Sequence, residues 1–438
     1  METHFGMRNH PFPFRPSAFW RDRNAALITY RTLSDIAGKA AFFAVTVLAA
    51  RRLSRDAFGI VSLGTTLGWM VAVATDFGMQ MHLARTVALR PGEARYLLDT
   101  WLTVRQRTAV IGLALLAVAI AATGMEGTRA VALLIFVATY AVSGLIEFLH
   151  YFYRGLSRSD IESTLTLGWR GTSLACAAAV LWWHPDVIVL ALALLVPACA
   201  TFAVSLRRGR RLVPAEDDSQ RSTAAAVDVW GELRHDVWPI GAGIVLSAVY
   251  FRVDVLLIEL WRGTEAVGLY NAVFRLVDAL RLFPAAVLAV VLPSLVRDTG
   301  TGSLFQVSAG LTGFAAGVTL VLWPLAGWLV TLVYGGAYAE AVPAFRILLL
   351  SFPLMSLNYA LTHQLIGWQR HRAYAAICGM ALVFNLASNA RLIPALSIVG
   401  AAWATVGTEL VVTFGCAAVL WRARSRQRTH PLGIGAAS

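Results

Sequence analysis

The sequence predicts an all-α membrane protein with about twelve transmembrane helices, arranged as two six-helix lobes with both termini cytoplasmic. One observation is the composition: 58% of the 438 residues are hydrophobic and 14% are charged, whereas a soluble domain has about a quarter charged residues. Another is that apolar runs of about 20 residues recur along the whole chain, which leaves no room for a soluble catalytic domain. A polar segment near the middle divides these runs into two equal sets.

The apolar runs define the expected spans. They lie at 29–50, 57–76, 103–123, 129–150, 163–183, 187–206, 238–259, 266–291, 304–334, 343–366, 373–393 and 397–421. An even number of spans returns the chain to the side on which it began. The N-terminal segment lacks the apolar core of a signal peptide, so we expect the first span to remain in the mature protein.

Basic residues are shared unevenly between the two sides of the membrane. Of the 37 lysines and arginines, 24 belong to the segments on the side of the termini, 6 to the opposite loops and 7 to the spans, where Arg105, Arg107, Arg129 and Arg391 at the span margins are counted with the adjoining segments. Because positive charge favours the cytoplasmic side, both termini are predicted to be cytoplasmic. The same rule explains the net charge of +12 without nucleic acid as a partner. One outer loop disagrees, since it carries Arg51, Arg52 and Arg55.

The polar connection at 207–237 separates a lobe at 29–206 from a lobe at 238–421, with tails at 1–28 and 422–438. The lobes share a short repeat, "SRDAFGIV" (54–61) and "GTEAVGLY" (263–270), each between the first and second spans of its half. Both copies read acid, alanine, apolar, glycine, apolar. This placement predicts two lobes related by pseudo-symmetry, and transporters bind substrate at the interface between such repeats.

The first span contains Lys39, which is the single lysine of the chain. Arg31, Asp35 and Lys39 are four residues apart, so they share one helix face. An ionisable group at this depth costs about 2.5–3.5 kcal/mol on insertion scales, so it needs a partner or a water-filled cavity. Two interpretations stay open: Asp35 and Lys39 neutralise each other within the helix, or the stripe faces a cavity between the lobes.

The second lobe carries its own charges at membrane depth. Arg252 and Asp254 are two residues apart, so they point to different faces and each needs a partner elsewhere, unless both reach the outer interface. Arg275, Asp278 and Arg281 follow one stripe with a positive surplus. In the twelfth span Glu409 is the sole ionisable residue, and is either a protonated structural acid or a carboxylate that exchanges a coupling proton.

Bases outnumber acids in the spans, which predicts a cationic cavity for an anionic substrate, because guanidinium and ammonium groups bind phosphate. The expected substrate-binding cations are Lys39, Arg252, Arg275 and Arg281. The candidates for coupling or charge balance are Asp35, Asp254, Asp278 and Glu409.

Catalytic signatures are scarce. The chain has no Walker P-loop, no metal-ligand spacing and no nucleophile elbow. The four cysteines all fall in apolar spans and give no disulfide framework. The sequence therefore predicts a transporter rather than an enzyme, with no cofactor and no metal.

Four segments resemble the bacterial polysaccharide biosynthesis family, the lipid-linked repeat-unit flippases of the multidrug/oligosaccharidyl-lipid/polysaccharide exporter superfamily. They are "AARRLSRDAFGIVSL" with "DFGMQMHLAR", "YFRVDVLLIELWRGTEAVGLYNAVFRLVDALRLFPAAVLAVVLPSLVR", "YGGAYAEAVPAFRILLLSFPLMSLNYAL" and "LIPALSIVGAAWATVGTELV". The likeness runs from about 30 to 421 and keeps its order. The arginine-rich first outer loop departs from the pattern.

The resemblance implies a two-lobed bundle in the bacterial inner membrane that moves an undecaprenyl-pyrophosphate-linked oligosaccharide to the outer leaflet for O-antigen, capsule or exopolysaccharide synthesis. It implies coupling to H⁺ or Na⁺, and partners such as a glycan polymerase and a chain-length regulator. The positions that fit the family's cationic cavity are Lys39, Arg252, Arg275 and Arg281. The alternatives are a multidrug or organic-cation antiporter of the same superfamily, a glycan polymerase or ligase, which would need larger outer loops, and a non-transporting scaffold.

Overall fold

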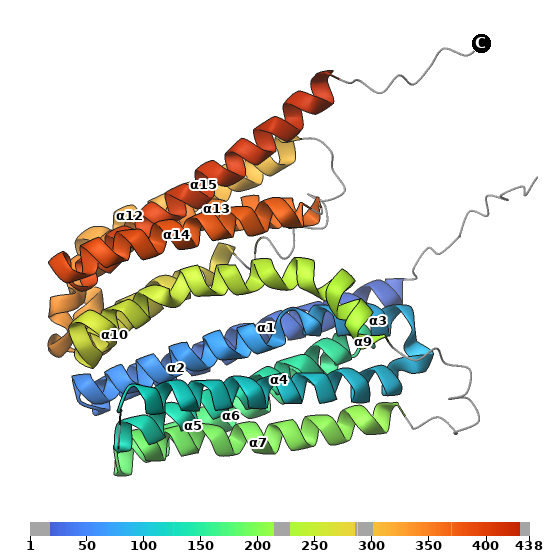
Figure 1. The fold of residues 1–438 in the computed structure, drawn as a ribbon, viewed down its shortest axis with the longest axis horizontal. Coiled ribbons are helices and arrows are strands. Elements are labelled where there is room, and N and C mark those ends of the chain that lie inside the picture. The colour runs from blue at the N-terminus through green and yellow to red at the C-terminus, as the bar shows by residue number, and fades with distance from the viewer. Residues whose placement is uncertain are drawn as a thin grey trace, which may run out of the picture.

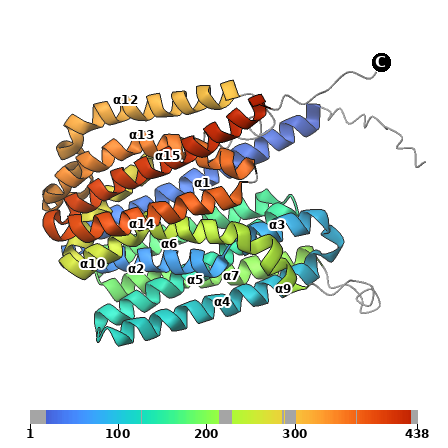
Figure 2. The ribbon, with the colours of Figure 1, turned by 45° about the horizontal axis from the view of Figure 1, so that its top comes forward.

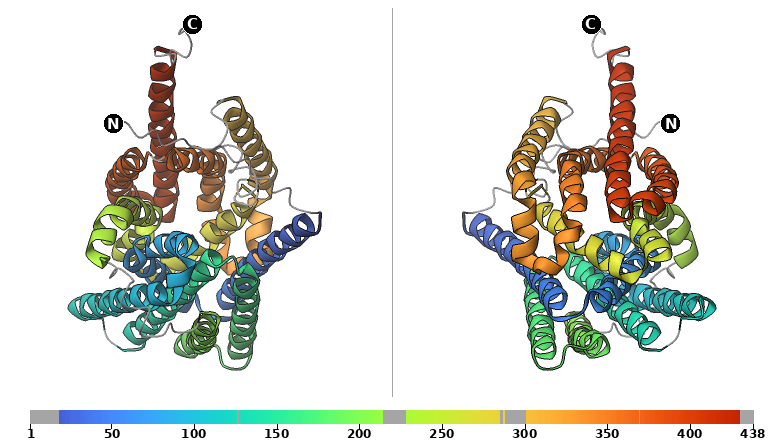
Figure 3. Two further views of the ribbon diagram at one scale, coloured as in Figure 1. Left: turned by 90° about the vertical axis from the view of Figure 1, so that its right-hand side faces the viewer. Right: turned by 90° about the vertical axis from the view of Figure 1, so that its left-hand side faces the viewer.

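The computed structural model describes residues 18–125, 127–213, 228–284, 287, 301–368 and 370–429. Every regular element within these ranges is a helix, and the long helices run roughly side by side (Figure 1). Figure 3 shows the bundle end-on, with the first half of the chain below and the second half above. The predicted all-α class with two lobes is confirmed.

The first half of the chain forms the N-lobe. Its six predicted spans all lie on helices, and one additional short helix, α3, follows a left-handed turn at Phe77 and Gly78 (φ 48° and 88°). The first helix begins earlier than predicted. The N-lobe helices are α1 (Ala18–Arg52), α2 (Arg55–Asp76), α3 (Met79–Leu89), α4 (Ala94–Ala122), α5 (Thr128–Gly155), α6 (Ser159–Trp183) and α7 (Val187–Leu212).

The second half forms the C-lobe, which is preceded by a short helix and one π-helical turn at 233–237. The seventh and eighth predicted spans form one element, α10, which kinks at Gly263, where φ is +80° and glycine carries no steric cost. Most of the predicted span beyond residue 284 lies outside the described residues. The helices are α9 (Val229–Glu232), α10 (Trp238–Leu280), α12 (Thr301–Tyr334), α13 (Val342–Gly367), α14 (His371–Leu396) and α15 (Ile398–Thr429).

Ten helices in the described part of the chain are long and apolar enough to cross a membrane. Kinked α10 counts once among them, and α6 is not included. Helix α6 carries Asp160, Glu162 and Arg170, and two of these line the cavity described below. The protein is therefore a multi-pass membrane protein, while the count of twelve spans stays a prediction.

The two ends of the bundle differ. Helix α1 begins and α15 ends on the right in Figure 1, and we call this the terminus end. The opposite, far end holds the α1–α2 turn, the α6–α7 turn and the kink of α10, as Figure 2 also shows. The start of α1 and the end of α15 lie on one side, which agrees with an even number of crossings.

Helices α2 and α10 join the lobes along their length. Trp69 packs edge-on against Phe251 in the middle of the pair, with ring centroids 6.3 Å apart, and Phe77 packs against Trp238 at the terminus end at 5.1 Å. This contact leaves the other side of the interface free to hold a cavity.

The two copies of the sequence repeat meet at the far end of this pair. A Cβ atom on Gly59 would lie 2.0 Å from the backbone oxygen of Thr264, and a Cβ on Gly268 would lie 2.9 Å from the backbone oxygen of Arg55. The repeat aligns Gly59 with Gly268 and Arg55 with Thr264, so the contact is reciprocal. Glycine at both positions lets the helix backbones touch, as in small-residue crossings of membrane helices.

The three arginines that oppose the charge rule are engaged at this far end. Their partners are carbonyl groups, an aromatic ring and two carboxylates: Leu332 and Val333 for Arg51, Trp182 for Arg52, and Glu265 and Glu340 for Arg55. Arg55 lies 3.0 and 3.2 Å from its two carboxylates. These arginines hold helices together at the far end. This structural role explains why they lie there, although the distribution of basic residues between the two sides of the membrane disfavours it.

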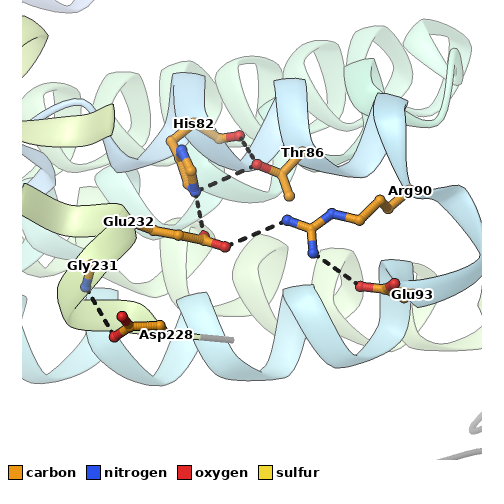
Figure 4. A network of polar contacts seen from close by, with 7 residues as sticks. All are labelled: His82, Thr86, Arg90, Glu93, Asp228, Gly231 and Glu232. Atoms are coloured by element: carbon orange, nitrogen blue, oxygen red, sulfur yellow. Dashed lines mark hydrogen bonds and ion pairs between the residues drawn. The ribbon is translucent and has the colours of Figure 1, made fainter. Parts of the chain in front are cut away.

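A polar network joins α3 to α9 at the terminus end (Figure 4). The carboxylate of Glu232 lies 2.8 Å from His82 Nε2 and 3.4 Å from Arg90 Nη2, and Arg90 also reaches Glu93 at 3.3 Å. The network fixes the segment that leads into α10 against the N-lobe.

Replacing Glu232 with glutamine should loosen this segment, because one charge serves both His82 and Arg90. We expect the free energy of local unfolding of this segment to fall by up to about 1 kcal/mol, since His82 and Arg90 are partly exposed. Faster hydrogen exchange over 229–237 would report it. Glu93→Gln removes a single Arg90 contact and is the matched control; equal exchange in both variants would contradict the assignment.

Candidate functional site

A cavity of about 700 Å³ lies between the lobes, in the half nearer the terminus end. Its walls come from α1, α5 and α6 of the N-lobe and from the second half of α10 and α13 of the C-lobe. The charged residues that line it are the bases Lys39, Arg154, Arg170, Arg275 and Arg281 and the acids Asp35, Glu147, Glu162 and Asp278.

Lys39 and Asp35 line this cavity from α1, and both residues are exposed. Among the described residues neither side chain has a hydrogen bond or an ion pair. The intrahelical pair that the sequence left open is therefore not formed. Arg31, the third member of the stripe, lies 3.8 Å from Glu162 of α6.

Asp278 is the centre of the charged wall on the C-lobe side. Its carboxylate lies 2.7 Å from Arg252 Nη2, 3.4 Å from Arg281 Nη1 and 3.7 Å from Arg275 Nη1. One carboxylate thus serves three guanidiniums. This wall keeps the positive surplus that the sequence predicted for the stripe.

Arg252 and Asp254 do not line this cavity, contrary to the expectation for a binding cation and a coupling acid. Arg252 is 4% exposed, and its guanidinium contacts Asn271 at 3.2 Å as well as Asp278. The Asp254 carboxylate accepts hydrogen bonds from the Tyr270 hydroxyl and from a backbone amide. Both side chains are buried in the C-lobe, because α10 turns these positions toward its own helices.

Arg170 enters the site from α6, a helix that contributes none of the predicted site residues. Its guanidinium stacks on Trp169, 3.9 Å from the ring centroid, and its stem lies against Gly38 of α1. The guanidinium carbons of Arg170 and Arg275 both lie within 6 Å of the Phe42 ring, at 5.9 and 5.1 Å. Cations from the two lobes therefore converge on one ring. The adjacent Trp169 and Arg170 can be seen in the sequence, but the sequence does not reveal that they face the cavity that Lys39 lines.

The acids bring the cavity nearer to neutrality than the sequence predicted. Glu162 is held by Arg154 Nε at 2.9 and 3.0 Å, so that pair cancels. Glu147 and Asp35 remain on the N-lobe wall as acids with no ion pair within 4 Å in the described residues. The net positive charge therefore depends mainly on the C-lobe wall around Asp278.

A second cavity of about 290 Å³ extends from the first into the N-lobe and shares Glu147, Arg170 and Arg275 with it. It ends at the pair of Arg105 and Asp76, whose facing atoms are 3.5 Å apart. Arg105 is fully buried and donates to the Thr75 hydroxyl and the Ala72 carbonyl. The count of basic residues places Arg105, at the margin of the third predicted span, with the cytoplasmic segment that precedes it. Its buried partner lies 29 residues earlier, so no local pattern reveals the pair.

A third cavity of about 330 Å³ lies on the C-lobe side and shares Arg281 and Tyr359 with the first. Glu409 of α15 lines it. Of the eight residues selected from the sequence, five therefore line the main cavity, one lines the third cavity, and two are buried behind the wall.

The described residues contain no group of three or more His, Cys, Asp or Glu side chains that could hold a metal ion. The four cysteines are free thiols.

Residues 25–297 match the family model described as polysaccharide biosynthesis protein. The chain belongs to this family. No curated protein matches the chain. The family match covers the N-lobe and the α10 wall, and so includes Lys39, Arg170 and the Asp278 group.

Solved structures share the fold of this family member over nearly the whole chain. The lipid II flippase MurJ in an inward closed conformation is 11% identical, covers 89% of this chain and 87% of its own, and has a TM-score of 0.69. An inward-facing multidrug resistance MATE family transporter is 13% identical, with coverage of 89% and 96% and a TM-score of 0.69. A MOP superfamily transporter from Pyrococcus furiosus is 13% identical, with coverage of 91% and 95% and a TM-score of 0.60. The chain therefore has the fold that these structures share.

Proposed function

We propose that this protein is a flippase that moves a pyrophosphate-linked oligosaccharide on an undecaprenyl lipid from the cytoplasmic to the outer leaflet of a bacterial inner membrane. Its product would feed O-antigen, capsule or exopolysaccharide assembly. Membership in a polysaccharide biosynthesis family supports a glycan substrate. The observation that carries the proposal is the set of cations that both lobes supply to one cavity: Lys39, Arg170, Arg275 and Arg281.

The diphosphate would bind between Lys39 and the Asp278 wall. Guanidinium forks bind phosphate oxygens in pairs, and the ammonium group acts as a point charge. Arg275 and Arg281 lie farther from Asp278 than Arg252 does, so they are the guanidiniums that an incoming anion would recruit. Asp278 then competes with the substrate for them, which keeps the affinity modest and permits release.

Alternating access would follow from a rocking motion of the lobes. The main cavity occupies the half near the terminus end, while the lobes touch at the far end through Gly59, Gly268 and the Arg55 ion pairs. With the termini cytoplasmic, this arrangement faces inward. Opening the far end and closing the terminus end would present the substrate to the outer leaflet, and the lipid tail would stay in the bilayer between the lobes.

An ion gradient would drive the cycle. Asp35 lines the cavity without a partner among the described residues, so it is the acid that we propose for H⁺ or Na⁺ exchange. A glycan polymerase and a chain-length regulator would consume the product.

Reconstitution with a fluorescent lipid-linked oligosaccharide in the inner leaflet tests the proposal, with flipping measured as the loss of fluorescence when the probe reaches an impermeant quencher outside the vesicle. Lys39→Ala and Arg275→Ala should each slow flipping about 10-fold or more, since a lost charge-assisted hydrogen bond is worth about 1.5–3 kcal/mol. Lys39→Arg should keep the flipping rate if Lys39 acts only through its charge. It should slow flipping if the site requires the geometry of the ammonium group. Arg207→Ala, an exposed arginine of α7, is the control.

The opposite outcome would favour the organic-cation antiporter, which the acids on the cavity wall keep in consideration. In that case Lys39→Ala and Arg275→Ala would not change the flipping rate from that of the wild-type protein. Neutralising Asp35 would then abolish efflux of an organic cation such as a dye.

A further inference from the structure

The third cavity, on the C-lobe side, has a lining unlike that of the main cavity. Helices α2, α10, α13, α14 and α15 enclose its 330 Å³. Its aromatic residues come from four of these helices: Trp69, Tyr250, Phe251, Tyr359 and Tyr374. Arg281, which lies at the border with the main cavity, and Glu409 are the charged residues that line it.

Glu409 is 5% exposed and its carboxylate is only half satisfied. Oε2 accepts a hydrogen bond of 2.7 Å from Asn358 Nδ2, and no donor within the described residues reaches Oε1. Asn358 is itself fixed, because its Nδ2 also donates to the Glu409 carbonyl and its Oδ1 accepts from Thr413. Oε1 is therefore an acceptor on the cavity wall that is available to a hydroxyl donor of a ligand.

Further polar groups surround the aromatic faces. His363 Nδ1 donates to the Tyr359 carbonyl at 2.7 Å, which makes Nε2 the free acceptor of a neutral ring. Ser247, Thr362 and Tyr374 add hydroxyl groups to the same lining. The cavity therefore combines flat apolar faces with several hydroxyl and acceptor groups around one carboxylate.

This lining selects among ligand classes. A polyprenyl chain would leave Glu409 unsatisfied, and a phosphate would be repelled by it. A coupling cation would occupy little of the cavity, which is far larger than an ion. A polyhydroxylated ring offers donors to the carboxylate and apolar C–H faces to the aromatic side chains.

We propose that this cavity binds the sugar residue next to the diphosphate, with Glu409 Oε1 accepting a hydroxyl hydrogen bond. The inference rests on the proposed flippase function and adds a separate saccharide subsite. Arg281 and Tyr359 line both cavities and therefore indicate how the substrate lies across them. The diphosphate lies on the Lys39 side of Arg281, and the sugar lies on the Glu409 side.

The test measures binding of two probes to the full-length protein in vesicles: undecaprenyl diphosphate, and the same lipid carrying a disaccharide. The wild-type protein should bind the glycosylated probe more tightly. Glu409→Gln should reduce that preference about 10-fold while binding of the bare diphosphate stays within about 2-fold. Lys39→Ala should weaken both probes equally, and Glu93→Gln, an acid-to-amide change remote from the cavity, should change neither.

Tyr374→Phe provides a second, uncharged variant in case Glu409→Gln folds poorly, and should lower the preference about 3-fold. The saccharide subsite would be overturned if Glu409→Gln weakened binding of the two probes equally. It would also be overturned if both Glu409→Gln and Tyr374→Phe kept the wild-type preference for the glycosylated probe. So would a Glu409→Gln protein that keeps its glycan preference but loses the response of flipping to a proton or sodium gradient. If the wild-type protein binds neither probe, the flippase proposal fails instead.

Discussion

Gly59→Ala should separate the lobes at the far end and stop transport. The new Cβ would lie 2.0 Å from the backbone oxygen of Thr264, and a backbone atom cannot rotate away as a side chain can. Overpacking of this kind costs about 1–3 kcal/mol, and the reciprocal contact at Gly268 would be disturbed together with it. The closed far end should therefore lose population.

Spin labels at Asp56 and Trp261, two exposed far-end positions on opposite lobes, would report the change as a longer distance. The labels require a background in which the four native cysteines are replaced. Gly313→Ala is the matched control, because no atom lies within 4 Å of a Cβ at that glycine. An unaltered distance and an unaltered flipping rate in Gly59→Ala would refute the crossing as the far-end seal.

Asp278→Asn should destabilise the C-lobe strongly. The change removes a carboxylate that lies within 4 Å of three guanidiniums, and Arg252, which is 4% exposed, would then be a buried charge with no carboxylate within 4 Å among the described residues. Breaking a buried ion pair from one side costs about 3–5 kcal/mol. We expect a lower thermal unfolding temperature in detergent and a loss of flipping.

Asp35→Asn is the paired comparison, since Asp35 lines the same cavity without an ion pair in the described residues. Its unfolding temperature should stay close to that of the wild-type protein. Combining Asp278→Asn with Arg252→Met should recover part of the lost stability, because no unpaired buried charge remains. If Asp278→Asn unfolds at the wild-type temperature, the carboxylate does not hold the wall together.

The sequence predicted the position of the α1 stripe better than its pairing. Residues four apart on a helix share a face, so Asp35 and Lys39 were certain to lie together. Whether they neutralised each other depended on which surface α1 presents to the cavity, and the structure leaves both without partners among the described residues. The spacing of the residues predicts that Asp35 and Lys39 share a face of α1, but it does not predict which groups surround that face.

The partners of the charged residues of α10 could not be predicted from the sequence either. Two residues apart, Arg252 and Asp254 could only be said to need separate partners. Those partners, Asp278 and Tyr270, lie 26 and 16 residues later, beyond the kink at Gly263. The fold-back at the kink brings them together, so no local pattern reveals that Arg252 and Asp254 are buried.

The membrane class, the helix-rich architecture and the two-lobed plan could be predicted from the sequence, because hydropathy is summed over about 20 consecutive residues and a repeat is visible in the letters. The sequence also predicts that Lys39 and the Arg275 stripe lie at membrane depth. The contacts of Asp278 with three arginines, the position of Arg170 in the cavity wall and the ion pairs of Arg55 at the far end are visible in the structure alone. Those contacts depend on distances across helices, and Arg55 and Glu340 are 285 residues apart in the chain.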